Sequence, residues 1–220
     1  MRTFFTALLS ILILGGTSAI AETIIPVQNP SFEIPILSSG NAPGEGGDST
    51  GSWITYVPYW TISDGGSAGE FLPGSAALPT GASNGQDVLW INSGYVYQTL
   101  PTTLQNLSTY TLTVDVAQRA DNGPISYYIY LMAGNTILAV DNSSLQPGPG
   151  AWLTSTLVYD SGRNNPLAGQ PFTIELGVNH PQTDFDNVTF VDPPDVPEPG
   201  SLLLLGTGLT TVAARLRRRR

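Results

Sequence analysis

Aromatic side chains in the segment Ile125–Met132 are the residues best placed to bind a ligand. As a β-strand this segment is apolar or aromatic on both faces; if the set that includes Tyr127 forms the core, Tyr128 and Tyr130 face outward or into a concave groove. Exposed rings stack on the apolar faces of sugars, and polar neighbours bind the hydroxyl groups. The residues predicted to form such a face are Tyr128, Tyr130, Arg119, Asp115, Tyr95 and Tyr97. The alternative is that these rings are buried, as aromatic side chains usually are.

Residues for catalysis are harder to assign. His180 is the only histidine, and it stands between Asn179 and Pro181 in a segment typical of a loop. Neither a Gly-x-Ser-x-Gly elbow nor a histidine pair for zinc occurs in the sequence. Paired carboxylates hydrolyse glycosides, but nothing selects two of the 17 acidic residues. The sequence therefore predicts a protein that is not an enzyme, with an enzyme acting on extracellular polysaccharide as an alternative.

Charge is distributed very unevenly along the chain. All 17 acidic residues lie between Glu22 and Glu198, where Arg119 and Arg163 are the only basic residues, so this region has a net charge near −15. Such a charge argues against binding nucleic acid and permits binding of cations. Cysteine is absent, which excludes disulfides and thiolate chemistry.

The elements that must position these residues are β-strands. Two segments, Tyr110–Val116 and Phe172–Val178, alternate between apolar and polar positions, and turn-forming residues separate them from other short β-rich runs. Further strands are expected at 24–27, 60–63, 88–92, 95–100, 125–132, 136–140, 152–159 and 185–191, with a loop at 38–52. This pattern predicts an all-β fold, an antiparallel sandwich over residues 22–192.

Several short motifs resemble those of galactose-binding-like jelly rolls, a group that includes many carbohydrate-binding modules. They are Asn29–Glu33, Tyr59–Thr61, Gly94–Leu100, Ser108–Leu112 and Asp184–Val188, in the order and spacing of that fold. The resemblance spans nearly the whole region between the termini and implies a jelly-roll sandwich. Function does not follow from it, because one fold hosts many functions.

The same resemblance implies a structural calcium ion that joins the first strand to the last. Glu33 and Asp186 stand at the matching positions, with the Ser31 carbonyl and the loop 84–87 as further oxygen ligands. The alternative is that Glu33 and Asp186 accept hydrogen bonds from backbone amides at the end of a sheet.

Both termini carry targeting signals. Arg2, an apolar run and Ala19-Ile20-Ala21 form a signal peptide, expected as a helix that is cleaved after residue 21. At residues 193–220, a Pro-Glu-Pro break precedes a short apolar run and terminal arginines. That run is short for a permanent span but is expected to form a transmembrane helix before processing.

This arrangement resembles the PEP-CTERM sorting signal of Gram-negative bacteria, whose substrates are processed by an exosortase, a membrane-bound transpeptidase. The residues that carry the resemblance are Val196, Pro197, Glu198, Pro199, Arg217, Arg218, Arg219 and Arg220. An ordinary C-terminal anchor is the alternative. The sequence thus predicts an exported protein of the cell surface or the extracellular matrix of a biofilm. Binding of exopolysaccharide is its first expected activity, and a purely structural or adhesive role is the alternative.

Overall fold

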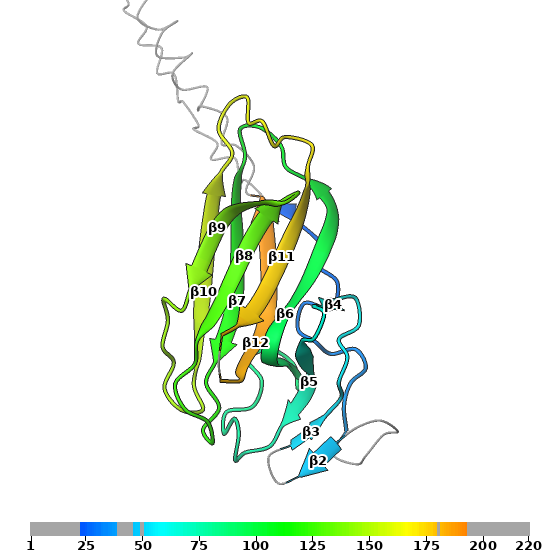
Figure 1. The fold of residues 1–220 in the computed structure, drawn as a ribbon, viewed down its shortest axis with the longest axis vertical. Coiled ribbons are helices and arrows are strands. Elements are labelled where there is room, and N and C mark those ends of the chain that lie inside the picture. The colour runs from blue at the N-terminus through cyan, green and yellow to red at the C-terminus, as the bar shows by residue number, and fades with distance from the viewer. Residues whose placement is uncertain (1–22, 39–45, 49–50, 180, 193–220) are drawn as a thin grey trace, which may run out of the picture.

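The structure is a computed structural model that describes residues 23–38, 46–48, 51–179 and 181–192. The described part of the chain holds twelve β-strands and no helix (Figure 1). The strands are β1 (Thr23–Ile24), β2 (Gly46–Asp48), β3 (Gly51–Trp53), β4 (Thr61–Ile62), β5 (Ser67–Pro73), β6 (Val88–Thr103), β7 (Thr109–Ala117), β8 (Tyr127–Ala133), β9 (Thr136–Asn142), β10 (Trp152–Asp160), β11 (Pro171–Val178) and β12 (Thr183–Asp192).

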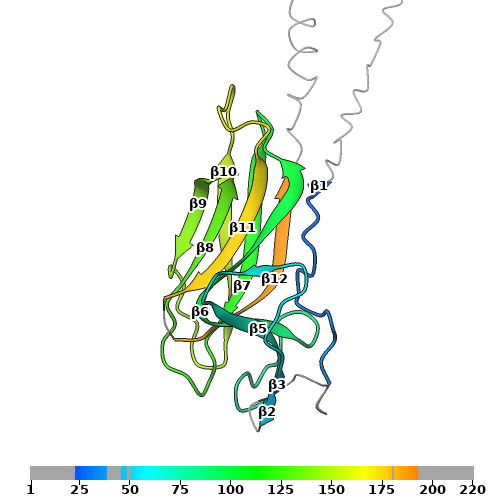
Figure 2. The ribbon, with the colours of Figure 1, turned by 45° about the vertical axis from the view of Figure 1, so that its right-hand side comes forward.

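These strands form an antiparallel sandwich of two sheets that share β6. Sheet A contains β10, β7, β12 and the first part of β6, and it is extended by β1, β5, β3 and β2. Sheet B contains β9, β8, β11, the second part of β6 and β4. In Figure 2, β8, β9 and β11 lie in front of β7, β10 and β12, which shows the two layers. The expected antiparallel jelly-roll-like sandwich is confirmed.

Strand β6 passes from one sheet to the other at Gly94. Residues 88–91 pair with β5 and β12 in sheet A, and residues 94–99 pair with β11 in sheet B. Gly94 has φ of 73°, a conformation that costs other residues energy. A side chain there would also meet Ser63 and Gly66, so glycine permits the change of sheet. The sequence predicted two separate strands here, because the glycine break hides their continuity.

The core lies between the sheets. Tyr110 of β7, Phe172 of β11 and Phe190 of β12 point inward and pack together. The centroid of the Phe172 ring lies 4.6 Å from that of Tyr110 and 5.1 Å from that of Phe190. All three rings are buried. Burial of an aromatic side chain of this size stabilises the fold by about 2–3 kcal/mol, so this cluster fixes β11 against sheet A.

A second apolar cluster lies on the outer side of sheet A. It packs β5 and the segment 74–82 over Val88, Trp90 and Ala117. Neither β5 nor the strands β2 and β3 were predicted, and the loop expected at 38–52 contains β2 and part of β3. Their composition is rich in glycine and serine, so tertiary pairing with β6 decides their conformation rather than local propensity.

A buried polar contact closes the sandwich along one side, where β9 and β10 are the last strands of their sheets. Asp141 of β9 accepts hydrogen bonds from the Tyr127 and Ser155 hydroxyl groups, which come from β8 and β10. The amide of Ser144 donates to the other carboxylate oxygen at 2.8 Å. These bonds hold β8, the strand with the predicted binding aromatics, against sheet A.

Candidate functional site: a tyrosine face with a central carboxyl group

Four tyrosines project from the outer side of sheet B. The register places Tyr95, Gly177 and Tyr128 in one row across β6, β11 and β8, and Tyr97, Glu175 and Tyr130 in the next row. We call the five residues Tyr95, Tyr97, Tyr128, Tyr130 and Glu175 the tyrosine face. Each of them is half-buried, while the alternating Tyr127, Ile129 and Leu131 are in the core. The prediction that Tyr128 and Tyr130 point outward is confirmed.

The rings form two neighbouring pairs. Tyr128 and Tyr130 are stacked, with centroids 4.8 Å apart and planes inclined by 30°, and Tyr95 and Tyr97 are tilted at 6.2 Å. The Tyr128 ring lies over Gly177, where any side chain would overlap it. Glycine at position 177 therefore lets Tyr128 lie across β11 towards β6. The result is a surface of aromatic rings on three adjacent strands.

Glu175 lies at the centre of this face and was missed by the sequence reasoning. Its backbone pairs with Tyr97 on one side and Tyr130 on the other. Burial raises the pKa of Glu175 above that of an ordinary glutamate. A signal was present, because Glu175 alternates with the inward residues Ile174 and Leu176 and must therefore face outward.

The electrostatics of the face couple Glu175 to a tyrosine. Burial raises the pKa of Tyr128 to about 12, and the nearby charge of Glu175 adds to this rise. Both groups are therefore held towards their neutral, protonated forms. A neutral carboxylic acid among aromatic rings can donate a proton to a bound molecule, and the rings can stabilise a positive charge that develops on it.

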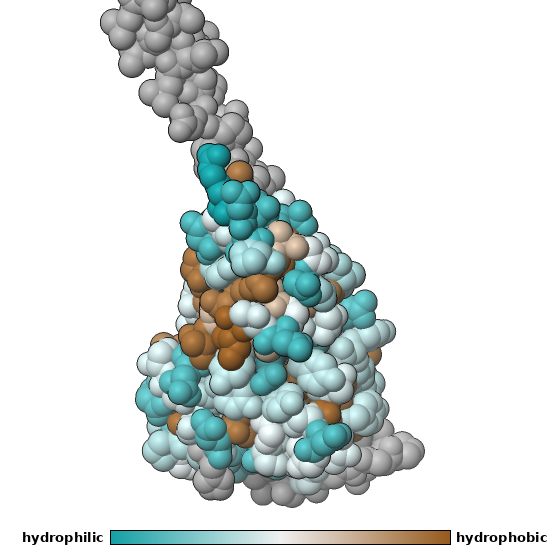
Figure 3. Space-filling model, turned by 45° about the horizontal axis from the view of Figure 1, so that its top comes forward, coloured by the Kyte–Doolittle hydropathy of each residue, from teal (hydrophilic) through white to brown (hydrophobic). Residues whose placement is uncertain are grey.

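The margins of the face differ in character. On the β9 side, Val140 pairs with Tyr130 and Ile137 pairs with Met132, and these two β9 side chains are 55% and 48% exposed. Figure 3 shows apolar side chains gathered on this part of the surface. In the next row along the strands, Thr99 of β6 and Thr173 of β11 share a hydrogen bond of 3.0 Å between their hydroxyl groups. A ligand on the tyrosine face would thus meet an apolar border and a hydroxyl border.

The structure does not bring Asp115 and Arg119 to this face. Asp115 points outward from sheet A, on the opposite side of the sandwich, where Thr154 and Asn187 donate hydrogen bonds to it. The expectation that β7 and β8 share one surface was wrong, because these strands belong to different sheets.

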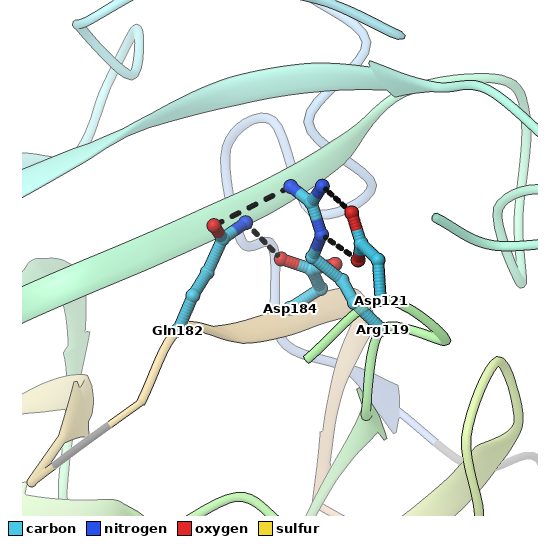
Figure 4. A network of polar contacts seen from close by, with 4 residues as sticks. All are labelled: Arg119, Asp121, Gln182 and Asp184. Atoms are coloured by element: carbon cyan, nitrogen blue, oxygen red, sulfur yellow. Dashed lines mark hydrogen bonds and ion pairs between the residues drawn. The ribbon is translucent and has the colours of Figure 1, made fainter. Parts of the chain in front are cut away.

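Arg119 belongs to a separate polar network at the end of sheet A (Figure 4). It binds Asp121 through two hydrogen bonds of 2.8 Å and 2.6 Å and lies over the Phe71 ring at 5.1 Å. Gln182 joins Arg119 to Asp184, with Gln182 Nε2 donating to Asp184 Oδ1 at 2.9 Å. Asp184 is fully buried, and its Oδ2 atom has no hydrogen-bond partner among the described residues. Burial raises the pKa of Asp184 to about 7, but a substrate cannot reach a fully buried carboxyl group.

Comparison with known proteins decides the family. The family model of the HpiC1 cyclase, described as HpiC1-like, matches residues 23–191. The chain belongs to the HpiC1-like cyclase family. A second model, the PEP-CTERM protein-sorting motif, matches residues 195–220. In sequence, no curated protein matches the chain.

Solved structures share the fold of this HpiC1-like protein. The apo form of a cyclase from Fischerella sp. has a TM-score of 0.68 and 24% identity, and covers 80% of this chain and 98% of its own. A cyclase from Fischerella sp. TAU in complex with 4-(1H-indol-3-yl)butan-2-one has a TM-score of 0.61 and 26% identity, covering 79% and 100%. The tandem CBM22 domain of Paenibacillus barcinonensis Xyn10C has a TM-score of 0.50 and 14% identity, covering 83% and 48%.

These findings correct the prediction that the protein is not an enzyme. That prediction rested on the lack of a recognisable catalytic motif, whereas the HpiC1-like family and the cyclase structures point to a cyclase domain. The likeness to a carbohydrate-binding module shows the shared sandwich fold. His180, the only histidine, lies outside the described residues.

The sorting motif is present in this HpiC1-like protein, as predicted. It indicates an exported protein that is processed by an exosortase at the membrane. The expected signal peptide and C-terminal transmembrane helix lie outside the described residues. Among residues the structure does describe, none form a helix with the length and hydropathy of a membrane span.

The residues predicted to bind calcium hold one loop from two sides. Glu33 Oε1 accepts the amides of Gln86 and Asp87 at 2.6 Å and 2.8 Å, and Asp186 Oδ2 accepts the amide of Asn84 at 2.8 Å. These contacts match the alternative to calcium, in which both carboxylates bind amides at the end of a sheet. No cluster of three or more acidic or histidine side chains suited to a metal occurs within the described ranges. Calcium binding by Glu33, Asp186 and the Ser31 carbonyl stays a prediction.

Proposed function

We propose that this protein is an exported enzyme of the cyclase family that binds an apolar, partly aromatic substrate on the tyrosine face. Glu175 acts as the general acid. The observation that carries this proposal is the position of one half-buried carboxyl group, with a raised pKa, between tyrosines on an open sheet face. Family membership supports the reaction class, since a cyclase joins two parts of one substrate.

The proposed chemistry uses the neutral form of Glu175. The carboxyl group donates its proton to an electron-rich carbon of the substrate, and the carbocation formed lies against the tyrosine rings. Bond formation within the substrate then closes a ring, and loss of a proton to the Glu175 carboxylate restores the acid. Substrate and product have the same mass, because no atom is gained or lost.

Binding can be tested with the indole that the related cyclase holds. We expect 4-(1H-indol-3-yl)butan-2-one to bind the protein, and Tyr130→Ala to weaken binding about tenfold, because one stacked ring is lost. Val158→Ala is the matched control, since Val158 is exposed on sheet A, away from the tyrosine face. Equal weakening by both variants, or no binding at all, would contradict the proposed site.

Catalysis is tested separately from binding, by measuring turnover of a substrate. Candidate indole substrates are incubated with the protein, and products of unchanged mass are separated by chromatography. Glu175→Gln keeps the shape of the side chain but removes the acidic proton, so turnover should fall by about 10²–10⁴-fold while binding is retained. Full turnover by Glu175→Gln would exclude Glu175 as the acid.

A second candidate function uses the same face to bind carbohydrate. The stacked Tyr128 and Tyr130 beside the Thr99 and Thr173 hydroxyl groups suit a pyranose, and the fold is shared with a carbohydrate-binding module. At the cell surface or in an extracellular matrix the ligand would be an exopolysaccharide. Arrays of plant, algal and bacterial polysaccharides test this candidate, and absence of binding across all of them would exclude it.

A further inference from the structure

Glu175 is bordered by tyrosine rings on both neighbouring strands (Figure 1). In its own row, Tyr97 of β6 and Tyr130 of β8 lie directly opposite, where Cβ atoms are about 4.5–5.5 Å apart. Tyr95 and Tyr128 stand diagonally in the next row, at about 7–8 Å, a distance that aromatic side chains span. The titratable groups that face Glu175 from its two neighbouring strands are therefore the four tyrosines.

The polar ends of these side chains come close to one another. Burial is the main cause of the raised pKa of Tyr128. The charges of Glu175, Tyr130 and Tyr95 add to it, which requires these groups to be near the Tyr128 hydroxyl. That hydroxyl end of the ring lies over Gly177, between β8 and β6. Rings from both strands and the carboxyl group therefore converge on one small area above β11.

The charge of the domain favours positive ligands. Between Glu22 and Glu198 the chain carries 17 acidic residues and two basic ones, Arg119 and Arg163. Neither arginine belongs to β6, β8 or β11, the strands of the tyrosine face. An acidic domain attracts cations and repels anions. A positively charged molecule is therefore drawn to this face, and no basic side chain on its strands opposes binding.

The chemistry of the face suits an organic cation better than a metal ion. A hard cation such as calcium needs several oxygen ligands from carboxylates and carbonyls, and the face holds one carboxyl group. Aromatic rings attract a positive charge that lies over them, and tyrosine is among the rings that bind methylated ammonium groups in this way. Because four rings surround one carboxyl group, a cation covered by methyl groups fits better than one with several N–H donors.

We propose that the tyrosine face is a binding site for a small, soluble organic cation that carries a methylated ammonium group. The cation lies over Glu175, with its methyl groups against the rings of Tyr97 and Tyr130. Its partner is the carboxylate form of Glu175, so binding releases to solvent the proton that the cyclase reaction uses. The cation therefore inhibits that reaction, and this last part of the inference rests on the proposed function.

Three related molecules separate the effect of charge from that of the methyl groups. Choline has both, 3,3-dimethylbutan-1-ol is its neutral carbon analogue, and ethanolamine has the charge without the methyl groups. Calorimetric titration of the full-length protein measures the three dissociation constants. We expect choline to bind about tenfold more tightly than either of the others. Equal affinity for ethanolamine would reveal a simple charge effect, and equal affinity for the alcohol a simple apolar effect; either result would overturn the site.

Variants locate the cation on the face. Tyr130→Phe keeps the ring and should bind choline as the original protein does, whereas Tyr130→Leu should weaken binding about three- to fivefold. Glu175→Gln should weaken binding about tenfold and abolish its pH dependence. In the original protein binding should be several-fold tighter at pH 8 than at pH 5, because only the carboxylate attracts the cation. Asp160→Asn is the matched control, since it removes a charge from sheet A; an equal loss in this variant would overturn the role of Glu175.

Further outcomes separate this inference from the proposed function. Choline binding by a protein that neither binds nor converts any indole would leave the cation site intact and refute the cyclase reaction alone. Indole turnover by a protein that does not bind choline would overturn the cation site alone. Phosphatidylcholine vesicles that displace choline would show that the ligand is a lipid headgroup, which overturns the assignment to a soluble cation.

Discussion

Replacing Glu70 with glutamine should change how the stability of this protein depends on pH. Glu70 of β5 is fully buried, accepts a hydrogen bond of 2.7 Å from Asn29 Nδ2, and leaves its other oxygen without a partner among the described residues. Burial raises the pKa of Glu70 to about 8, with smaller contributions from the charges of Asp87 and Glu33. In Glu70→Gln, the new amide oxygen would keep the acceptor for Asn29, and the ionisation would be removed.

The sign and size of the effect follow from proton linkage. In the unfolded chain Glu70 ionises near its ordinary pKa of 4.5, whereas in the folded protein it stays protonated until about pH 8. Stability contributed by this group is fully present below the lower pKa and is lost as pH rises towards the upper one. A difference of one unit between the folded and unfolded pKa values corresponds to about 1.36 kcal/mol. Between pH 5 and pH 8 the free energy of unfolding therefore falls by about 3 kcal/mol because of Glu70.

Urea unfolding followed by tryptophan fluorescence at pH 5, 6, 7 and 8 measures this loss. The original protein and Glu70→Gln both contain Asp184 and Asp186, whose pKa values burial raises to about 7. Both proteins therefore lose some stability between pH 5 and pH 8 because of these two residues. The variant should lose about 3 kcal/mol less than the original protein. Any fixed cost of burying the amide group cancels in this comparison of slopes.

A matched control is Asp64→Asn, because Asp64 lies in the turn between β4 and β5, outside the buried site. The free energy of unfolding of this variant is measured over the same pH range, so that an effect of the buried site is separated from a general effect of replacing a carboxyl group by an amide. If Glu70→Gln also loses as much stability between pH 5 and pH 8 as the original protein does, Glu70 is ionised in the fold and the reasoning fails.

Other expectations concern the tyrosine face, the predicted cation and the tail. Glu175→Gln should lower the pKa of Tyr128, measured by ultraviolet absorbance in alkaline solution, because a nearby negative charge is removed; an unchanged value would show that the two groups do not interact. Gly177→Ala should displace the Tyr128 ring and weaken indole binding about three- to tenfold, and unchanged binding would mean that this ring does not contact the ligand. If calcium joins Glu33 to Asp186, EDTA should lower the melting temperature, and an unaltered melt would exclude the ion. Replacing the Pro-Glu-Pro motif by alanines should leave the domain folded but change its processing, whereas unchanged display would mean that the tail is only a membrane stop.

Local pattern was enough to predict most of the fold. Strict alternation in β7 and β11 identified their inward faces, since each has an apolar residue at every second position. The pattern failed for β5, whose residues are buried on both faces because a second apolar cluster covers the outer side of sheet A. No alternation survives when both sides of a strand are buried.

The candidate site was predicted in part for the same reason. Tyr128 and Tyr130 had to face away from the core once Tyr127 and Ile129 were assigned to it, and they do. The order of the strands in the sheet decides which other strands contribute to that face. No single segment of the sequence indicates this order. Consequently Asp115 was placed on the wrong side, and Glu175 of β11 was overlooked although it pairs with Tyr130.

By itself the sequence determined the class of fold and the sorting signal, because each depends on residues close together in the chain. Only the tertiary structure decided that β11 lies between β6 and β8, so that one carboxyl group stands among four tyrosine rings. It also decided that Arg119 serves a polar network at the end of sheet A and is not on the tyrosine face. These outcomes depend on pairing between distant strands, which is chosen by the packing of a whole core rather than by any segment alone.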